Sequence, residues 1–166
     1  CNANFDKMDY LISEILENSR NFKDGIRAIT TKIHSFGAKN QTIYAIETGM
    51  DVLRELGQGL PKKARLVYIV GDFIKTKRML RKFTDDQILN LPVMKNDDHL
   101  AATKILSLLY PYTFICQPEM APLITFRLIQ LTLRYGISPI SSTAFATYGM
   151  LLCMSFNEVN EGYVES

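Results

Sequence analysis

Apolar side chains recur at three- and four-residue spacings along most of the chain, a spacing typical of helices that bury one face. Polar residues fill the positions between them, and breaks in the pattern separate one helix from the next. The pattern predicts helices over residues 5–18, 22–36, 40–56, 62–83, 98–109, 118–135 and 140–156, with a short turn over 85–90.

Two segments fit more than one structure. Residues 67–70 have the local propensity of a short strand, but their neighbours keep a helical period, so we expect a helix there. Pro111 interrupts the apolar pattern after residue 109, and a proline removes one backbone donor from a helix. Residues 112–116 therefore either continue as helix beyond a kink or are extended.

Glycines and prolines mark the expected joints between helices. Gly37, Gly57 and Gly136 each follow a helical pattern, and glycine often ends helices because it adopts positive φ at little cost. Pro61 is expected to start the next helix, and Ser138–Pro139 offers a cap followed by a first-turn proline.

These helices and short joints predict an all-α fold of stacked antiparallel helical hairpins. We expect a single domain over residues 1–166, with hairpins at roughly 4–57, 61–92 and 97–166.

The most informative stretch, residues 123–153, holds two helical patterns joined at 135–139. A unit of about 34 residues with this form resembles a tetratricopeptide hairpin. Thr132 replaces the small residue of that motif, and its closing proline is missing, so we expect a tetratricopeptide-like α-α superhelix. Residues close to the motif's spacing are Leu128, Leu131, Tyr135, Ala144, Tyr148 and Leu151.

Composition is that of an ordinary globular protein, with 47% apolar and 22% charged residues. The net charge of +2 is too small to indicate a polyanion partner, but it is unevenly distributed. Residues 62–82 hold eight Lys or Arg and one acid, Asp72, a net of +7 (eight minus one), so the remainder carries −5 (two minus seven).

The cysteines and histidines do not indicate a metal site. Cys1, Cys116 and Cys153 are odd in number and widely spaced, so we expect buried, reduced thiols rather than disulfides. His34 and His99 lie apart in the sequence without a Cys-x-x-Cys pair, so zinc is not expected.

The longest nearly apolar run, residues 105–116, is shorter than the roughly 20 residues of a membrane span. The first residues are polar and acidic, unlike a signal peptide. We therefore expect a cytoplasmic protein without a membrane span. Because the chain lacks an initiator Met and stops abruptly at residue 166, we expect it to be a piece of a longer polypeptide.

The basic segment, residues 62–82, is the first candidate contact surface. Its charges either form a solvated outer face that also complements the helix C-terminus, or dock an acidic protein partner, or face nucleic acid. Aromatic residues that stack on bases are sparse in this segment, so nucleic acid is not expected. The candidate contact residues are Lys62, Lys63, Arg65, Lys75, Lys77, Arg78, Arg81 and Lys82.

A second candidate is the dense set of aromatic residues between 110 and 148. Core packing is the ordinary role of such residues. The alternative is a concave groove for a peptide or a neighbouring domain, in which Tyr112, Tyr135 and Tyr148 make the contacts. The same three tyrosines would line the pocket of a small helical ligand-binding protein, which is a third possibility.

The remaining polar cluster is Asp97–Asp98–His99. Metal binding or acid-base chemistry would need further ligands, whereas capping of the next helix by Asn96, Asp97 or Asp98 explains the two acids. His34 is not in a phosphoacceptor motif of histidine kinases, so we expect an ordinary histidine on a helix surface.

Three stretches carry a resemblance to a known family. They are residues 56–61 (Leu-Gly-Gln-Gly-Leu-Pro), residues 91–94 with the run 100–106, and residues 135–149. Together they resemble the helical region that follows the ATPase module in large bacterial multi-domain signalling proteins. Those polypeptides join a serine/threonine-kinase-like domain, an AAA-type ATPase, this helical region, often a GAF sensor domain, and a histidine kinase or similar output.

The resemblance implies that kinase and ATPase chemistry lies in other domains of the parent chain. This sequence has no Gly-x-x-x-x-Gly-Lys-Ser/Thr loop and no His-Arg-Asp or Asp-Phe-Gly triplet. We therefore expect a non-catalytic helical scaffold or linker that needs no cofactor and contacts neighbouring domains or another protein. The alternative is a free-standing, peptide-binding tetratricopeptide-like domain.

Overall fold

The computed structural model describes Glu14 and residues 22–162, and within them it confirms the all-α prediction. The helices are α2 (Phe22–Ala38), α3 (Thr42–Glu55), α4 (Leu66–Leu80), α5 (Asp85–Leu89), α6 (Asp97–Cys116), α7 (Ala121–Tyr135) and α8 (Ser141–Gly162), with a 3-10 turn, η1, at Pro118–Met120. The helix expected over residues 5–18 lies outside the described residues, apart from Glu14. Residues 67–70 are helical, as expected.

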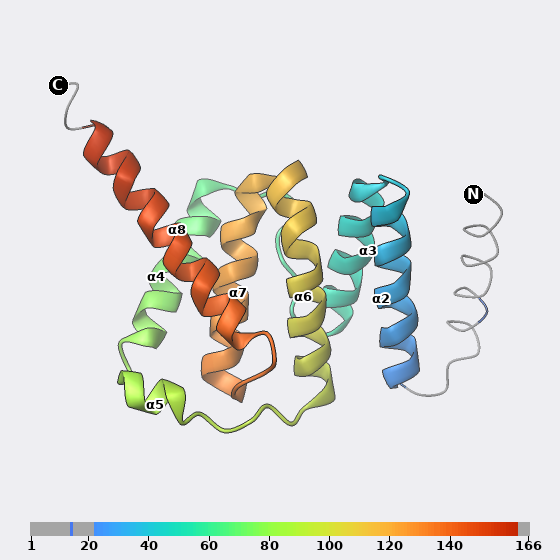
Figure 1. The fold of residues 1–166 in the computed structure, drawn as a ribbon, viewed down its shortest axis with the longest axis horizontal. Helices are drawn as coiled ribbons and strands as arrows, with labels where there is room; N and C mark the ends of the chain where they lie inside the picture. Colours follow the sequence, from blue (N-terminus) through green and yellow to red (C-terminus); the bar gives the residue numbers. More distant parts are fainter. Residues whose placement is uncertain (1–13, 15–21, 163–166) are drawn as a thin grey trace.

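The helices form a row in which α2 packs against α3, α3 against α6, and α6 against α7 (Figure 1). The helices α6 and α7 are central, because each packs against four other elements: α6 against α2, α3, α7 and η1, and α7 against α4, α6, α8 and η1. The partner of α4 is therefore α7 and not α5, with which it was expected to form the hairpin 61–92. These contacts establish an all-α fold of packed neighbouring helices, and a tetratricopeptide-like superhelix stays a prediction.

The core lies between α3, α6 and α7. Side chains with no exposed surface include Leu53 of α3, Ile105 and Leu109 of α6, and Leu123 and Ile129 of α7. Burying each such side chain contributes about 1.5–3 kcal/mol. A β-carbon on Gly49 would lie 2.6 Å from the Leu109 side chain, so this glycine allows α3 to approach α6 closely.

Two of the three predicted glycine joints are confirmed. Gly57 follows α3 with a φ of 69°. Gly136 follows α7 with a φ of 105°, and a β-carbon there would overlap the carbonyl oxygen of Pro92. Residues 92–94 and 137 meet at this point through hydrogen bonds from Met94 N to Ile137 O (2.8 Å) and from Ile137 N to Pro92 O (2.7 Å).

The third joint differs from the prediction. Gly37 does not end its helix, because α2 continues to Ala38 and the positive φ (59°) belongs to Asn40. Gly37 is instead a packing residue. A β-carbon there would overlap the ring of Tyr112, which lies against α2.

The expected interruption at Pro111 does not occur, and α6 runs unbroken from Asp97 to Cys116. Pro111 is exposed, so its ring lies on the outer side of the helix. The hydroxyl of Thr113 donates to the carbonyls of Leu109 (3.1 Å) and Tyr110 (2.9 Å) and supports the backbone beside the proline. Residues 112–116 are therefore helical.

The helix expected from residue 62 begins only at Leu66 and ends at Leu80. Leu60 is buried and anchors the connection to the core, and Arg65 is extended (φ −117°, ψ 147°). Pro61 therefore lies in a connection rather than in a first helical turn. At the other end of the chain, α8 begins beyond a turn at 139–140 and extends to Gly162, past the predicted end at residue 156.

Candidate functional site: the outer face of α4

The helix α4 lies at the edge of the molecule (Figure 1). It exposes several aliphatic side chains. Leu66 is 75% exposed, Val67 69%, Ile74 50% and Val70 44%. Soluble proteins rarely expose several aliphatic side chains together. Where they do, the exposed apolar patch commonly marks an interaction site.

These side chains lie on one side of the helix together with two cations. At about 100° per residue, Leu66, Val67, Val70, Ile74, Lys77 and Arg78 fall within a sector of about 120°. These six residues are called the outer face of α4 below. Ile69, Phe73, Thr76 and Leu80 occupy the neighbouring sector, about 60° wide, which packs against α7.

Apolar residues lie on two sides of this helix, and their spacing in the sequence does not show which side is buried. Leu66, Val70 and Ile74 are exposed. Residues 66, 70, 74 and 69, 73, 80 form two parallel apolar stripes, and only the second one meets α7. A surplus stripe on one helix is the signal that would have indicated this surface.

A buried polar cluster fixes which side of α4 faces α7. The Gln130 side-chain amide, only 3% exposed, donates to Thr76 Oγ1 (3.0 Å) and to Asp72 Oδ1 (3.3 Å). Thr76 Oγ1 in turn donates to the Asp72 carbonyl at 2.7 Å. Because these groups would be left unsatisfied if α4 rotated, the outer face is held toward solvent.

The predicted basic residues do not all lie on this face. Lys62, Lys63 and Arg65 lie in the connection before α4, where all three are exposed. Lys75 lies 3.9 Å from Asp72, and Lys77 Nζ lies 5.7 Å from the ring centroid of Phe73. The remaining members, Arg78, Arg81 and Lys82, are exposed at the C-terminal end of the helix and just beyond it.

The three candidate tyrosines contact different neighbours. Tyr112 lies against Gly37 of α2, Tyr135 stacks on His99 with ring centroids 3.5 Å apart, and Tyr148 meets Phe126 edge-on at 6.2 Å. His99 and Tyr112 are 13 residues apart on α6, which corresponds to about 20 Å. The positions of Tyr112 and Tyr135 therefore do not converge on one pocket. Burial raises the pKa of Tyr148 above its ordinary value.

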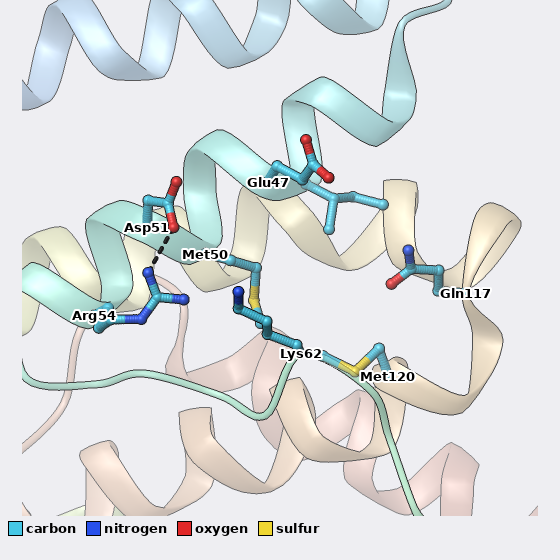
Figure 2. A pocket seen from close by; sticks show the side chains of 8 residues that line it. Glu47, Met50, Asp51, Arg54, Lys62, Gln117 and Met120 are labelled. Atoms are coloured by element: carbon cyan, nitrogen blue, oxygen red, sulfur yellow. Dashed lines mark hydrogen bonds and ion pairs between the residues drawn. The ribbon is translucent and has the colours of Figure 1, made fainter.

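A separate pocket of about 270 Å³ lies between α3, the connection 56–65 and the turn after α6 (Figure 2). Its floor contains the buried side chains of Ile46, Met50 and Met120. Charged residues stand at its rim: Asp51 pairs with Arg54 at 2.6 Å, while Glu47 and Lys62 supply one further charge of each sign. Of the predicted contact residues, only Lys62 lines this pocket.

Of the three residues expected to cap α6, Asn96 is the N-cap, and the two acids follow it inside the helix. Asn96 Oδ1 accepts a hydrogen bond from the His99 backbone N–H at 3.0 Å, and Asp97 and Asp98 occupy the first helical turn. Such acids are stabilised by the helix N-terminus. His34 is exposed, as expected. Across the described residues, no group of three or more His, Cys, Asp or Glu residues is arranged to hold a metal ion.

Two cysteines differ from the prediction of burial. Cys116 and Cys153 are both exposed free thiols. Cys116 is the last residue of α6, and Cys153 lies in the second half of α8. Apolar neighbours in the sequence therefore did not predict whether these two thiols are buried.

In the part of the chain that the structure describes, no helix has both the length and the apolar character needed to cross a bilayer. No protein-family model, curated protein or solved structure matches the chain. The candidate contact surface is the outer face of α4, because its aliphatic side chains are exposed while the helix itself packs against α7.

Proposed function

We propose that this chain is a non-catalytic helical module that mediates contacts between domains or proteins in a larger cytoplasmic signalling polypeptide. The resemblance to the helical region of bacterial kinase–ATPase–sensor proteins supports that setting. Kinase and ATPase activity would then belong to other domains of the polypeptide, and this module would need no cofactor of its own.

The observation that carries the proposal is the outer face of α4. Its aliphatic side chains are largely exposed, although the neighbouring side of the same helix is packed against α7. Covering apolar surface contributes about 25 cal/mol per Å² removed from water, so a partner that covers Leu66, Val67, Val70 and Ile74 is favoured. Few charges would have to be desolvated at the centre of such a contact.

The mechanism of such a module is mechanical. The packed helices α3, α6 and α7 move as one stiff unit because their shared core is close-packed. A partner that binds α4 in one arrangement of the larger polypeptide stabilises that arrangement and shifts the population toward it. The module would in this way couple the state of one neighbour to that of another.

The test compares hydrogen exchange of residues 1–166 alone with exchange in the full polypeptide encoded by its gene. We expect the amides of α4 to exchange more slowly in the full polypeptide, because a neighbour covers the outer face. Ile74→Glu should abolish this protection. Ile43→Glu, at a position of matched exposure (51%) on α3, should leave it unchanged. Equal exchange of α4 in the two chains would contradict the proposal.

A further inference from the structure

The outer face of α4 is polarised along the helix axis. Its aliphatic residues, Leu66 to Ile74, occupy the first nine positions, whereas Lys77 and Arg78 lie in the last turn. Arg81 and Lys82 follow directly, so positive charge accumulates at one end of an apolar stripe. The face from Leu66 to Arg78 is about 18 Å long, the length of a helix of about 12 residues.

Most of the charges at this end are free to meet a partner. Within the described residues, the side chains of Arg78, Arg81 and Lys82 form no hydrogen bond or ion pair. The nearest acids in the sequence, Asp85 and Asp86, lie in the first turn of α5 behind the Thr84 capping box. Within the described part of the chain, neither acid forms an ion pair with the basic end of α4.

A second copy of this chain is a poor occupant of the face. In a twofold antiparallel pair of α4 helices, Lys77 and Arg78 of each copy would approach Lys63 and Arg65 of the other. Since residues 62–82 carry a net charge of +7, the pairing would bring like charges together at both ends. A partner that matches the charge of this face therefore has to carry acidic residues.

We infer that the outer face of α4 binds a helix of a partner protein that carries acidic residues in its first turns and an apolar stripe after them, and that the two helices run antiparallel. The inference rests on the proposed function, because it names the partner of the same surface. The acidic turns lie against Lys77, Arg78 and Arg81, and the apolar stripe covers Leu66, Val70 and Ile74.

The direction follows from helix electrostatics. Acids are stabilised at the N-terminus of their own helix, and the bases of α4 are stabilised at its C-terminus, so an antiparallel pair satisfies both helices where they meet. At the other end, the partial negative charge of the partner's C-terminus lies near Lys63 and Arg65. A parallel partner would place its positive N-terminal end there instead.

The experiment selects binders for the intact 166-residue chain from a displayed library of helical peptides. Peptides that also bind an Ile74→Gln variant, which removes the apolar side chain without adding a charge, are removed because they need only the charge of the protein. Recovered peptides are then measured by fluorescence anisotropy at low and high salt. We expect acids in their first two turns and an apolar stripe after them. A peptide with the two halves exchanged should bind at least tenfold more weakly.

Charge reversal at the basic end gives the second measurement. Arg78→Glu combined with Arg81→Glu should weaken the recovered peptides about tenfold at low salt and much less at high salt, because exposed charges are screened. Lys95→Glu combined with Lys104→Glu, at two exposed positions outside α4, is the control with the same change in net charge and should change little. Both effects together support the inference.

Other outcomes overturn it in separable ways. Selected peptides that need Ile74 but lack acids, or carry them in the last turns, refute the partner named here and leave the contact surface itself intact. Failure to recover any peptide that depends on Ile74 refutes the proposed function as well. Binding to phosphatidylserine vesicles that Ile74→Glu abolishes would assign the face to a membrane, and Ile74-dependent dimers in sedimentation would assign it to a second copy.

Discussion

At the scale of single residues, the position of α4 depends on a polar group in an apolar interface. Gln130 is almost fully buried between α4 and α7, and its amide satisfies both Thr76 and Asp72. Hydrogen bonds of this kind contribute about 1 kcal/mol each, while the loss of a partner inside a core costs about 1–3 kcal/mol. The side chain of Gln130 thus fixes the rotation of α4 and, with it, the direction in which the outer face of α4 points.

Replacement of this residue tests that role. Gln130→Leu should lower the free energy of unfolding by about 1–2 kcal/mol, because Asp72 and Thr76 lose their shared donor. Gln41→Leu is the control, since Gln41 is exposed and its side chain forms no capping hydrogen bond to α3. Urea denaturation of both variants measures the difference. An unchanged stability of Gln130→Leu would show that apolar packing alone positions α4.

The role of a single residue was predictable from the sequence where its residue type usually has one structural role, as glycine has after a helix and asparagine before one. Gly57 and Gly136 have positive φ, and Asn96 caps α6, as their sequence positions indicated. Gly37 has a different use, because the ring that requires its missing side chain comes from Tyr112, 75 positions later. A contact between residues so far apart in the chain cannot be recognised from the sequence around either one.

At the scale of helices, a proline inside α6 shows how packing overrides local preference. Pro111 removes a backbone donor, yet the helix continues to Cys116, with Tyr112 and Thr113 packed on its inner side. Contacts of α6 with α2, α3 and α7 offset the lost hydrogen bond. Periodicity alone predicted an end near residue 109 because it contains no information about those partners.

We expect replacement of two prolines by alanine to change the free energy of unfolding in opposite directions. Pro111→Ala should raise the free energy of unfolding by about 1 kcal/mol, because it restores the hydrogen bond to the Ser107 carbonyl and removes a ring from the helix interior. Pro139→Ala, in the turn before α8, should instead lower stability by about 0.5 kcal/mol through a more flexible unfolded chain. Chemical denaturation of the two variants distinguishes the signs, and a loss of stability in Pro111→Ala would show that the helix bends around its proline.

At the scale of the whole molecule, the class of fold was predictable and the pairing of helices was not. Short joints correctly indicated that α2 and α3 lie side by side, and likewise α7 and α8. The connection 56–65 is longer and carries the buried Leu60, which directs α4 away from α3 and onto α7. Because the sequence pattern contains no information about that long-range packing, it could not show which apolar stripe of α4 is exposed.

The same arrangement predicts an order of local stability. Four elements pack against α7, whereas α4 is held almost entirely by α7 alone. Local opening requires less energy where fewer contacts are lost, so native-state hydrogen exchange of residues 1–166 should be slowest in α7 and the facing turns of α6. Amides of α4 should exchange at least tenfold faster than those of α7, although both helices have 15 residues.

Gln130→Leu sharpens this measurement, because it weakens only the attachment of α4. It should accelerate exchange in α4 by more than in α6, where the contacts are unchanged. Equal acceleration throughout the described helices would mean that α4 opens only with the whole domain. In that case α4 would be an integral part of the folded core rather than an edge helix, and a partner bound to its outer face would stabilise the entire domain equally.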